Sequence, residues 1–214
     1  MSSRPLIVPR PLIVLGTTNR KKGLELAELL APVGIELQTL ADFPDAISVV
    51  EDGDTFAANA ALKAVGQARH LARWVLGEDS GLSVDALDGG PGVFSARYSG
   101  PNATDESNNR RLLDELSDLP PRQRTAGYVC HMTLADPAGK IHAESEASCR
   151  GRILFEPRGT GGFGYDPLFE IIEYHRSFAQ LGPLVKGQLS HRGRAARRLI
   201  PQLAKLVDAG ALTP

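Results

Sequence analysis

Two adjacent carboxylates, Glu78 and Asp79, stand directly before Ser80-Gly81 in this 214-residue sequence. The apolar residues that precede them predict a strand that ends at the acids, followed by a turn that exposes their side chains. Carboxylate oxygens are the ligands that Mg²⁺ prefers, and a carboxylate can also deprotonate or orient water. Adjacent strand residues point to opposite faces, so we expect Glu78 and Asp79 to play different roles. A solvated acidic turn is the alternative, and the tetrapeptide alone favours it.

Two stretches rich in Lys and Arg could bind phosphate groups. The first is R-K-K at 20–22, which follows an apolar run at 12–15 and a polar loop and begins a predicted helix. A buried strand, a loop and a helix in this order point backbone N–H groups at an anion. Positive charge in the first turn opposes the helix dipole, so it favours anion binding over a capped helix with a solvated turn. The loop does not match the P-loop pattern.

The second basic stretch lies near the C-terminus, where seven Lys or Arg and no Asp or Glu occur between Tyr174 and Val207. A helix is predicted from about Ser190, a suitable N-cap residue, to Val207. Near its start we expect a phosphate or base contact from Lys186, His191 and Arg192. Further along we expect a solvated basic face that carries Arg197, Arg198 and Lys205.

A glycine-rich segment, G-T-G-G-F-G-Y-D-P at 159–167, could line a pocket for a ring. Its glycines allow the backbone to approach a ligand closely, while Phe163 and Tyr165 supply flat aromatic faces. Asp166 could accept a hydrogen bond from a ring nitrogen or an amine. A plain glycine turn without a ligand is the alternative.

The remaining patterns predict one mixed α/β unit with a β-hairpin. Strands are expected at 35–40 and 47–50, before 95–98, and as a hairpin at 125–135 and 141–149. Helices are expected at 55–73 and from Thr104. Glu51 then stands just before a helix, either as a surface acid or as a third carboxylate of a metal site. We expect His131 to be a paired surface histidine, and Cys130 and Cys149 to be small buried side chains.

Length and composition exclude several classes of protein. The hydrophobic content of 42% and charged content of 23% are those of an ordinary globular domain with a sizeable core. A net charge of −1 and 6% aromatic residues argue against a nucleic-acid-binding protein. No apolar run approaches the roughly 20 residues that span a membrane, and the N-terminus has no signal-peptide pattern. Two cysteines make neither a disulfide framework nor a zinc site, so we expect a cytoplasmic protein.

Clustered carboxylates, basic anion sites and a glycine-aromatic pocket together predict a Mg²⁺-dependent enzyme that acts on a nucleoside polyphosphate. At this point the sequence also resembles the inosine/xanthosine triphosphate pyrophosphatase family. The likeness covers about residues 12–206 and is carried by six segments in order: G-T-T-N-R-K-K (16–22), E-D-G-D-T-F-A-A-N-A (51–60), E-D-S-G-L-S-V-D-A-L (78–87), G-G-P-G-V-F-S-A-R-Y-S-G (89–100), G-T-G-G-F-G-Y-D-P (159–167) and K-G-Q-L-S-H-R-G (186–193).

The resemblance implies a two-lobed, mixed-sheet α/β domain over 12–207 with a central substrate cleft, between a loose lead-in at 1–11 and a tail at 208–214. It implies a homodimer that cleaves ITP, dITP and XTP between the α and β phosphates and releases pyrophosphate. Asp79 would be the proton acceptor for the attacking water, and Mg²⁺ would be held by Glu51, Asp79 and Glu78. The triphosphate would bind Thr17, Asn19 and Lys22, with Ser80 as a further substrate contact. The base pocket would comprise Phe163, Gly164, Tyr165, Asp166, Lys186, His191 and Arg192.

The base could be selected by one hydrogen-bond donor. Inosine and xanthosine carry a 6-keto acceptor where adenosine carries an amino donor. A donor such as Arg192 facing that position would pair with the keto base and leave adenine mismatched, at about 1–3 kcal/mol for each unpaired buried group.

The chain departs from the family pattern at three positions. Glu78 stands where Asp is usual, Ala58 replaces a common Glu, and Gln180 stands where an acid is common. The changes at 78 and 58 leave the secondary metal ligands open. A Maf-like pyrophosphatase with another base preference and a nucleotide-binding regulator without catalysis are the competing hypotheses.

Overall fold

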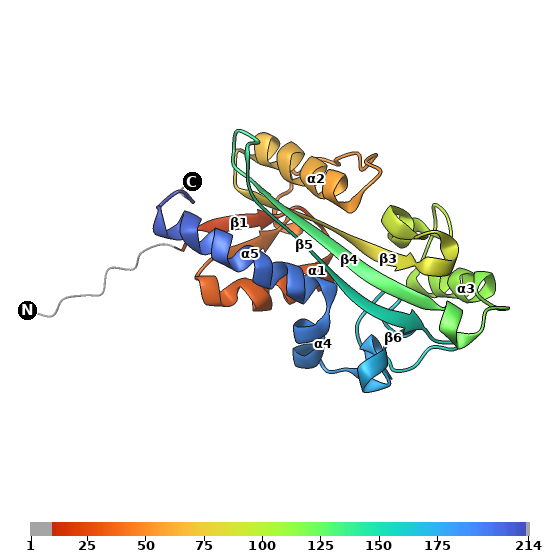
Figure 1. The fold of residues 1–214 in the computed structure, drawn as a ribbon. Helices are drawn as coiled ribbons and strands as arrows, with labels where there is room; N and C mark the ends of the chain where they lie inside the picture. Colours follow the sequence, from red (N-terminus) through yellow and green to blue (C-terminus); the bar gives the residue numbers. More distant parts are fainter. Residues whose placement is uncertain (1–9, 213–214) are drawn as a thin grey trace, which may run out of the picture.

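The computed structural model describes residues 10–212 and contains one seven-stranded mixed sheet flanked by helices (Figure 1). The strand order is β2-β1-β3-β4-β5-β6-β7, with β2, β1 and β3 parallel and the remaining pairs antiparallel. The strands are β1 Leu12–Leu15, β2 Glu36–Thr39, β3 Val75–Val84, β4 Thr125–Ala135, β5 Ile141–Ile153, β6 Phe169–Ile171 and β7 Arg176–Ser177. The predicted mixed α/β class is confirmed.

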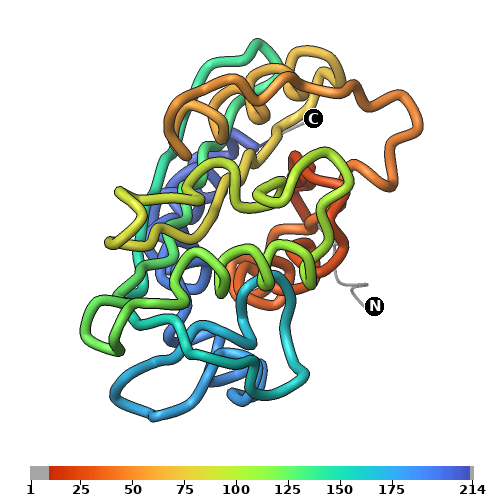
Figure 2. The backbone as a smooth tube through the Cα atoms, turned by 90° about the vertical axis from the view of Figure 1, so that its right-hand side faces the viewer, coloured from red at the N-terminus to blue at the C-terminus, as the bar shows by residue number. Residues whose placement is uncertain are grey.

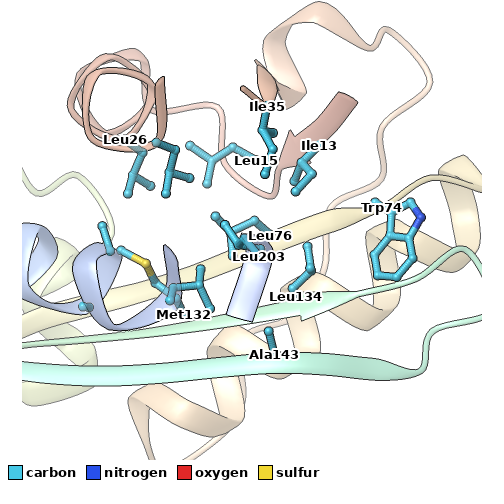
Figure 3. Close-up of a cluster of buried hydrophobic side chains, with 14 of the residues drawn as sticks. Ile13, Leu15, Leu26, Ile35, Trp74, Leu76, Met132, Leu134, Ala143 and Leu203 are labelled. Atoms are coloured by element: carbon cyan, nitrogen blue, oxygen red, sulfur yellow. The ribbon is translucent and has the colours of Figure 1, made fainter. Parts of the chain in front are cut away.

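The helices pack on both faces of this sheet. They are α1 Arg20–Leu30, α2 Phe56–Leu71, α3 Asp105–Glu115, α4 Pro183–Leu189 and α5 His191–Asp208. Helix α5 covers β4 and β5 beside α1, and α2 covers β3 and β4 from the opposite face (Figure 1). A cluster of buried apolar side chains lies under α1 and α5, and Figure 3 shows Leu26, Leu76, Leu134 and Leu203 gathered in it.

Strand β3 passes straight through the paired acids, so the predicted turn at Ser80-Gly81 was wrong. All ten of its residues pair with β4, and Leu82 and Val84 continue the buried pattern beyond the acids. The glycines on either side of the acids are needed because other backbone lies against them. A Cβ on Gly77 would collide with the carbonyl oxygen of Ala60 in α2, and one on Gly81 would collide with the carbonyl oxygen of Gly92 and the hydroxyl of Ser95.

Most predicted elements are present and two are not. The strands at 12–15 and 36–39, the hairpin, and the helices that begin after Thr55, Thr104 and Ser190 are confirmed, with each of these three side chains accepting an N-cap hydrogen bond. Residues 47–50 form no strand, and 92–97 form a 3₁₀ helix in place of the short strand. Helix α4 was not predicted.

A buried polar row on α2 explains why 47–53 is held without joining the sheet. Asn59, Lys63 and Gln67 are spaced four residues apart and are each at most 8% exposed. The Asn59 side chain accepts from the Gly53 N–H at 2.9 Å, and the Gln67 amide donates to the Ile47 carbonyl at 2.5 Å. These bonds satisfy backbone groups that a strand would have paired in a sheet.

Helix α5 protects the open edge of β5. Arg194 donates to the Ser148 carbonyl at 3.1 Å, Arg198 donates to the Glu146 carbonyl, and Gln202 donates to the Glu144 carbonyl at 2.7 Å. Arg197 likewise donates to the Gly187 carbonyl at 2.9 Å. Arg198 and Lys205 are exposed, as expected for a solvated basic face, and Arg197 is half-buried; both arginines also satisfy backbone carbonyls.

The predicted lead-in at 1–11 and tail at 208–214 lie partly outside the described residues, and these boundaries stay a prediction. Leu212, which is described, packs into the core. Within residues 10–212, none of the helices combines the length and the apolar character needed to cross a membrane.

Candidate active site

Asp79 faces α2 and forms one half of a carboxylate pair. Lys63 places its Nζ 2.8 Å from Asp79 Oδ1 and 2.9 Å from Glu51 Oε2. The two acids come from different elements, β3 and the loop before α2, and the close packing of α2 on Gly77 brings them to the same ammonium. Burial raises the pKa of Asp79 even against the attraction of Lys63. A carboxylate with a raised pKa is better suited to accept a proton near neutral pH.

The same ammonium is held firmly in its charged form. Burial by itself lowers the pKa of Lys63, but the carboxylates of Asp79 and Glu51 outweigh it and raise the pKa above its usual value. The position between the carboxylates of Glu51 and Asp79 therefore favours a positively charged group.

Glu78 faces the opposite side of β3, as alternation in an extended strand requires. Its Oε2 lies 2.7 Å from Lys22 Nζ, and its Oε1 accepts from Arg192 Nη2 at 3.0 Å and from the Cys130 thiol at 3.4 Å. Burial would raise the pKa of Glu78, but Lys22 and Arg192 hold it well below its usual value. The structure therefore separates Glu78 from Glu51 and Asp79, so the three predicted metal ligands do not form one group.

A chain of ion pairs continues from Glu78 to the glycine-rich segment. Arg192 Nη1 lies 2.6 Å from Glu25 Oε2, and Lys186 Nζ bridges Glu25 Oε1 and Asp166 Oδ2 at 2.7 Å each. Glu78 and Glu25 hold the pKa of Arg192 above its usual value in spite of burial. The ion pairs fix α1, α4, α5 and the glycine-rich segment relative to one another.

One cavity of about 140 Å³ collects most of the predicted substrate-binding residues. It is lined by Asn19, Lys22, Ser80, Phe163, Gly164, Tyr165, Asp166, Lys186, His191 and Arg192, together with Gly81, Ser95, Ala96, Asp105, Asn108 and Tyr128. Thr17 does not line it; its hydroxyl accepts from the Asn19 N–H at 3.1 Å and shapes the loop instead. Asn19 caps α1 by accepting from the N–H groups of Lys21 and Lys22.

Phe163 and His191 provide flat surfaces in this cavity. The Phe163 ring lies under three cations, with Lys186 Nζ 4.7 Å from its centroid and Arg192 and Lys21 slightly farther. The His191 ring stacks on Tyr128 at 4.6 Å between centroids and 7° between planes. Burial and the neighbouring Arg192 lower the pKa of His191 well below its usual value, so the imidazole is neutral. Its buried Nδ1 has no hydrogen-bond partner within residues 10–212.

Lys63, Glu25 and Tyr128 belong to the site but were not predicted from the sequence. Lys63 could have been found, because a polar row with a four-residue spacing on an Ala-rich helix indicates buried partners. Glu25 is the first acid after the basic run on α1, which favours a pairing role without naming the partners. Tyr128 carries no such signal, since an aromatic residue in a strand is more often part of the core.

Comparison with known proteins gives consistent matches over nearly the whole chain. A model of the Ham1 family matches residues 13–202. A protein of Rhodopirellula baltica named dITP/XTP pyrophosphatase is 55% identical over 199 residues, which are 93% of this chain and 96% of that protein. A dITP/XTP pyrophosphatase of Desulforamulus reducens is 46% identical over 194 residues, covering 91% and 96%. The structure of a HAM1 protein from Coxiella burnetii superposes with a TM-score of 0.82 at 36% identity, covering 91% of this chain and 98% of that one.

Proposed function

Because the chain belongs to the Ham1 family, we propose that it hydrolyses the non-standard purine nucleotides ITP, dITP and XTP to the nucleoside monophosphate and pyrophosphate. The observation that carries this proposal is the single cavity that joins two basic helix starts to an aromatic wall beside β3. A triphosphate would bind at the basic helix starts, and a purine ring would pack against the aromatic wall.

The phosphate end of the substrate lies at the start of α1. Asn19 and Lys22 line the cavity there, and the helix N-terminus adds its own positive partial charge. Lys22 is already paired with Glu78, so it is fixed in place before the substrate arrives. Such preorganised charge stabilises the negative charge that develops on the leaving pyrophosphate.

Mg²⁺ fits the pair formed by Glu51 and Asp79. Both carboxylates converge on one cationic group, the ammonium of Lys63, so this position already favours positive charge. Within residues 10–212 no cluster of three or more acidic, His or Cys side chains forms a complete metal cage. Mg²⁺ suits this arrangement, because it commonly binds one or two carboxylates and takes its other ligands from phosphates and water. When bound, it would neutralise charge on the phosphates.

Asp79 is the proton acceptor in this proposal. Burial raises the pKa of Asp79 toward the pH at which it would work, while the attraction of Lys63 favours its ionised form. Glu78 lies on the other side of the strand and holds Lys22 and Arg192 for the substrate.

Arg192 can read the base with one remaining N–H group. A guanidinium has five N–H donors. Among the described residues, Arg192 donates from Nε and Nη2 to Glu78, from Nη2 to Ser80 at 3.0 Å, and from Nη1 to Glu25. One N–H on Nη1 is left for the 6-keto oxygen of hypoxanthine or xanthine, and it opposes the amino group of adenine. One such mismatch gives roughly tenfold to hundredfold discrimination.

The remaining features follow from the resemblance, for the homodimer and the domain, and from composition and charge, for the compartment and the partners. The enzyme acts as a cytoplasmic homodimer on free nucleotides, without nucleic acid and without a membrane, as one domain over 12–207. Size-exclusion chromatography with light scattering tests the dimer.

The proposed reaction is tested by product analysis. ITP, XTP, GTP and ATP are incubated separately with the protein and Mg²⁺, and the products are separated by anion exchange. The proposal expects IMP and pyrophosphate from ITP, with ATP turned over at least about tenfold more slowly. IDP and orthophosphate, or equal rates on ATP, would contradict it, and nucleotide binding without turnover would favour the regulator.

A further inference from the structure

Helix α3 holds the glycine-rich segment at one backbone residue, from two sides. The Gly164 N–H donates to Asp105 Oδ2 at 2.8 Å, and the Gly164 carbonyl accepts from Asn109 Nδ2 at 3.0 Å. Asp105 and Asn109 are four residues apart and so lie on the same face of α3. In Figure 2 the green α3 runs beside the cyan chain that contains this segment.

Gly164 lies between the two aromatic residues of the base pocket. Its φ is +63°, in the left-handed region, so the backbone turns here and the directions of Phe163 and Tyr165 depend on this residue. The flanking groups are also held: the Phe163 N–H donates to Asp166 Oδ2 at 2.9 Å, and the Tyr165 hydroxyl donates to the Ser95 carbonyl at 2.8 Å.

The Asn109 side chain makes no hydrogen bond other than the one to Gly164 among the described residues. Its Oδ1 is buried and has no hydrogen-bond partner among the residues that the structure describes. A buried amide oxygen without a partner costs free energy, so the bond from Nδ2 to Gly164 is what the residue contributes. Asp105 also lines the cavity, which places this contact at the wall that faces the substrate.

We propose that Asp105 and Asn109 are positioning residues that fix Gly164, and through it the Phe163–Tyr165 wall, in the orientation that binds the purine base. This inference rests on the proposed function, and it adds α3 to the elements that form the base pocket. Neither residue needs to touch the base. Their effect falls on the base end of the site and leaves the phosphate end, at Asn19 and Lys22, unchanged.

The test compares two ligands that each probe one end of the site. IMP and pyrophosphate binding are measured by calorimetry for the wild type, Asp105→Ala and Asn109→Leu. Each variant is expected to raise the Kd for IMP about three- to tenfold, the effect of one hydrogen bond, and to leave the Kd for pyrophosphate within about twofold.

Two matched variants separate positioning from charge and from folding. Asp105→Asn removes the same charge as Asp105→Ala but keeps an oxygen that can accept from Gly164, so it is expected to restore most of the IMP affinity. Arg110→Ala changes an exposed residue of the same helix and is expected to bind both ligands like the wild type. An IMP affinity unchanged in both Asp105→Ala and Asn109→Leu, or a parallel loss of pyrophosphate binding, would overturn the inference.

Amide hydrogen exchange of 159–166 in the free protein keeps this test separate from the reaction. Faster exchange in Asp105→Ala and Asn109→Leu, but not in Arg110→Ala, supports the proposal that Asp105 and Asn109 fix Gly164. This result would hold even if the wild type bound neither ligand, and in that case only the proposed function would fail. Exchange equal to that of the wild type in both variants would overturn the proposal that Asp105 and Asn109 fix Gly164.

Discussion

Replacing Arg192 by Met would test whether Glu78 is an organising residue of the site. Arg192 is 2% exposed and the Glu78 side chain is fully buried. Without the guanidinium, Glu78 keeps only Lys22 and the weak thiol donor of Cys130 as partners. Removing one partner of a buried ion pair costs about 3–5 kcal/mol, because the other charge is left uncompensated. That is a large part of the roughly 5–15 kcal/mol that stabilise a typical domain.

Urea unfolding at pH 7.5 measures this cost as a change in midpoint at constant m. The Glu78→Gln variant and the double variant complete a cycle. Hydrogen bonds to charged groups contribute about 1.5–3 kcal/mol, so the double variant is expected to lose about that much less than the sum of the single losses.

The pH dependence of the unfolding free energy is a second measure of the Glu78–Arg192 ion pair. Because the folded pKa of Glu78 is below its unfolded value of 4.5, its contribution is complete above that pH and is lost as the pH falls. Glu78→Gln should therefore flatten the acid side of the stability curve. A loss below about 1 kcal/mol in Arg192→Met, or single losses that simply add, would show that Glu78 does not depend on Arg192 for its stability in the core.

Three further predictions concern other parts of the site. The pKa of His191 in the folded protein lies well below its unfolded value of 6.5, so only the unfolded state takes up a proton there as the pH falls. Between pH 7.5 and 5.5 the wild type should therefore lose about 1 kcal/mol of unfolding free energy that His191→Phe does not lose, as measured by paired urea titrations. Gly77→Ala should cost at least about 1–3 kcal/mol, because its Cβ collides with α2; thermal unfolding checks this. Lys63→Met removes the attraction on Asp79, so the acid limb of the pH–rate profile should move to higher pH.

Much of the fold could be predicted because its local signals agree with its tertiary structure. The N-caps Thr55, Thr104 and Ser190 each precede a helix with a buried stripe, and the hairpin turn at 136–140 joins two long strands. The turn predicted at Ser80-Gly81 failed because a glycine in sequence does not reveal whether it serves a turn or a close approach. Residues 47–50 look strand-forming, but the Ile47 carbonyl accepts from the Gln67 side chain of α2 and the stretch pairs with no strand.

The sequence was enough to predict which residues belong to the site, but not which charged side chains form ion pairs with one another. Alternation along a strand was enough to place Glu78 and Asp79 on opposite faces. The sequence could not show that α2 brings Lys63 to Asp79, or that Glu25 connects Arg192 with Lys186, because these pairs span 16 to 167 positions of chain. Long-range partners of charged residues depend on how the helices pack.

The two adjacent carboxylates of β3 are proposed to have different roles, with Asp79 accepting the proton from the attacking water. Pyrophosphate release from saturating ITP with Mg²⁺ tests it most directly in Asp79→Asn, beside a measurement of IMP binding. Turnover is expected to fall about 10²–10⁴-fold while the Kd for IMP stays within about twofold. Turnover near the wild-type rate in Asp79→Asn would contradict it.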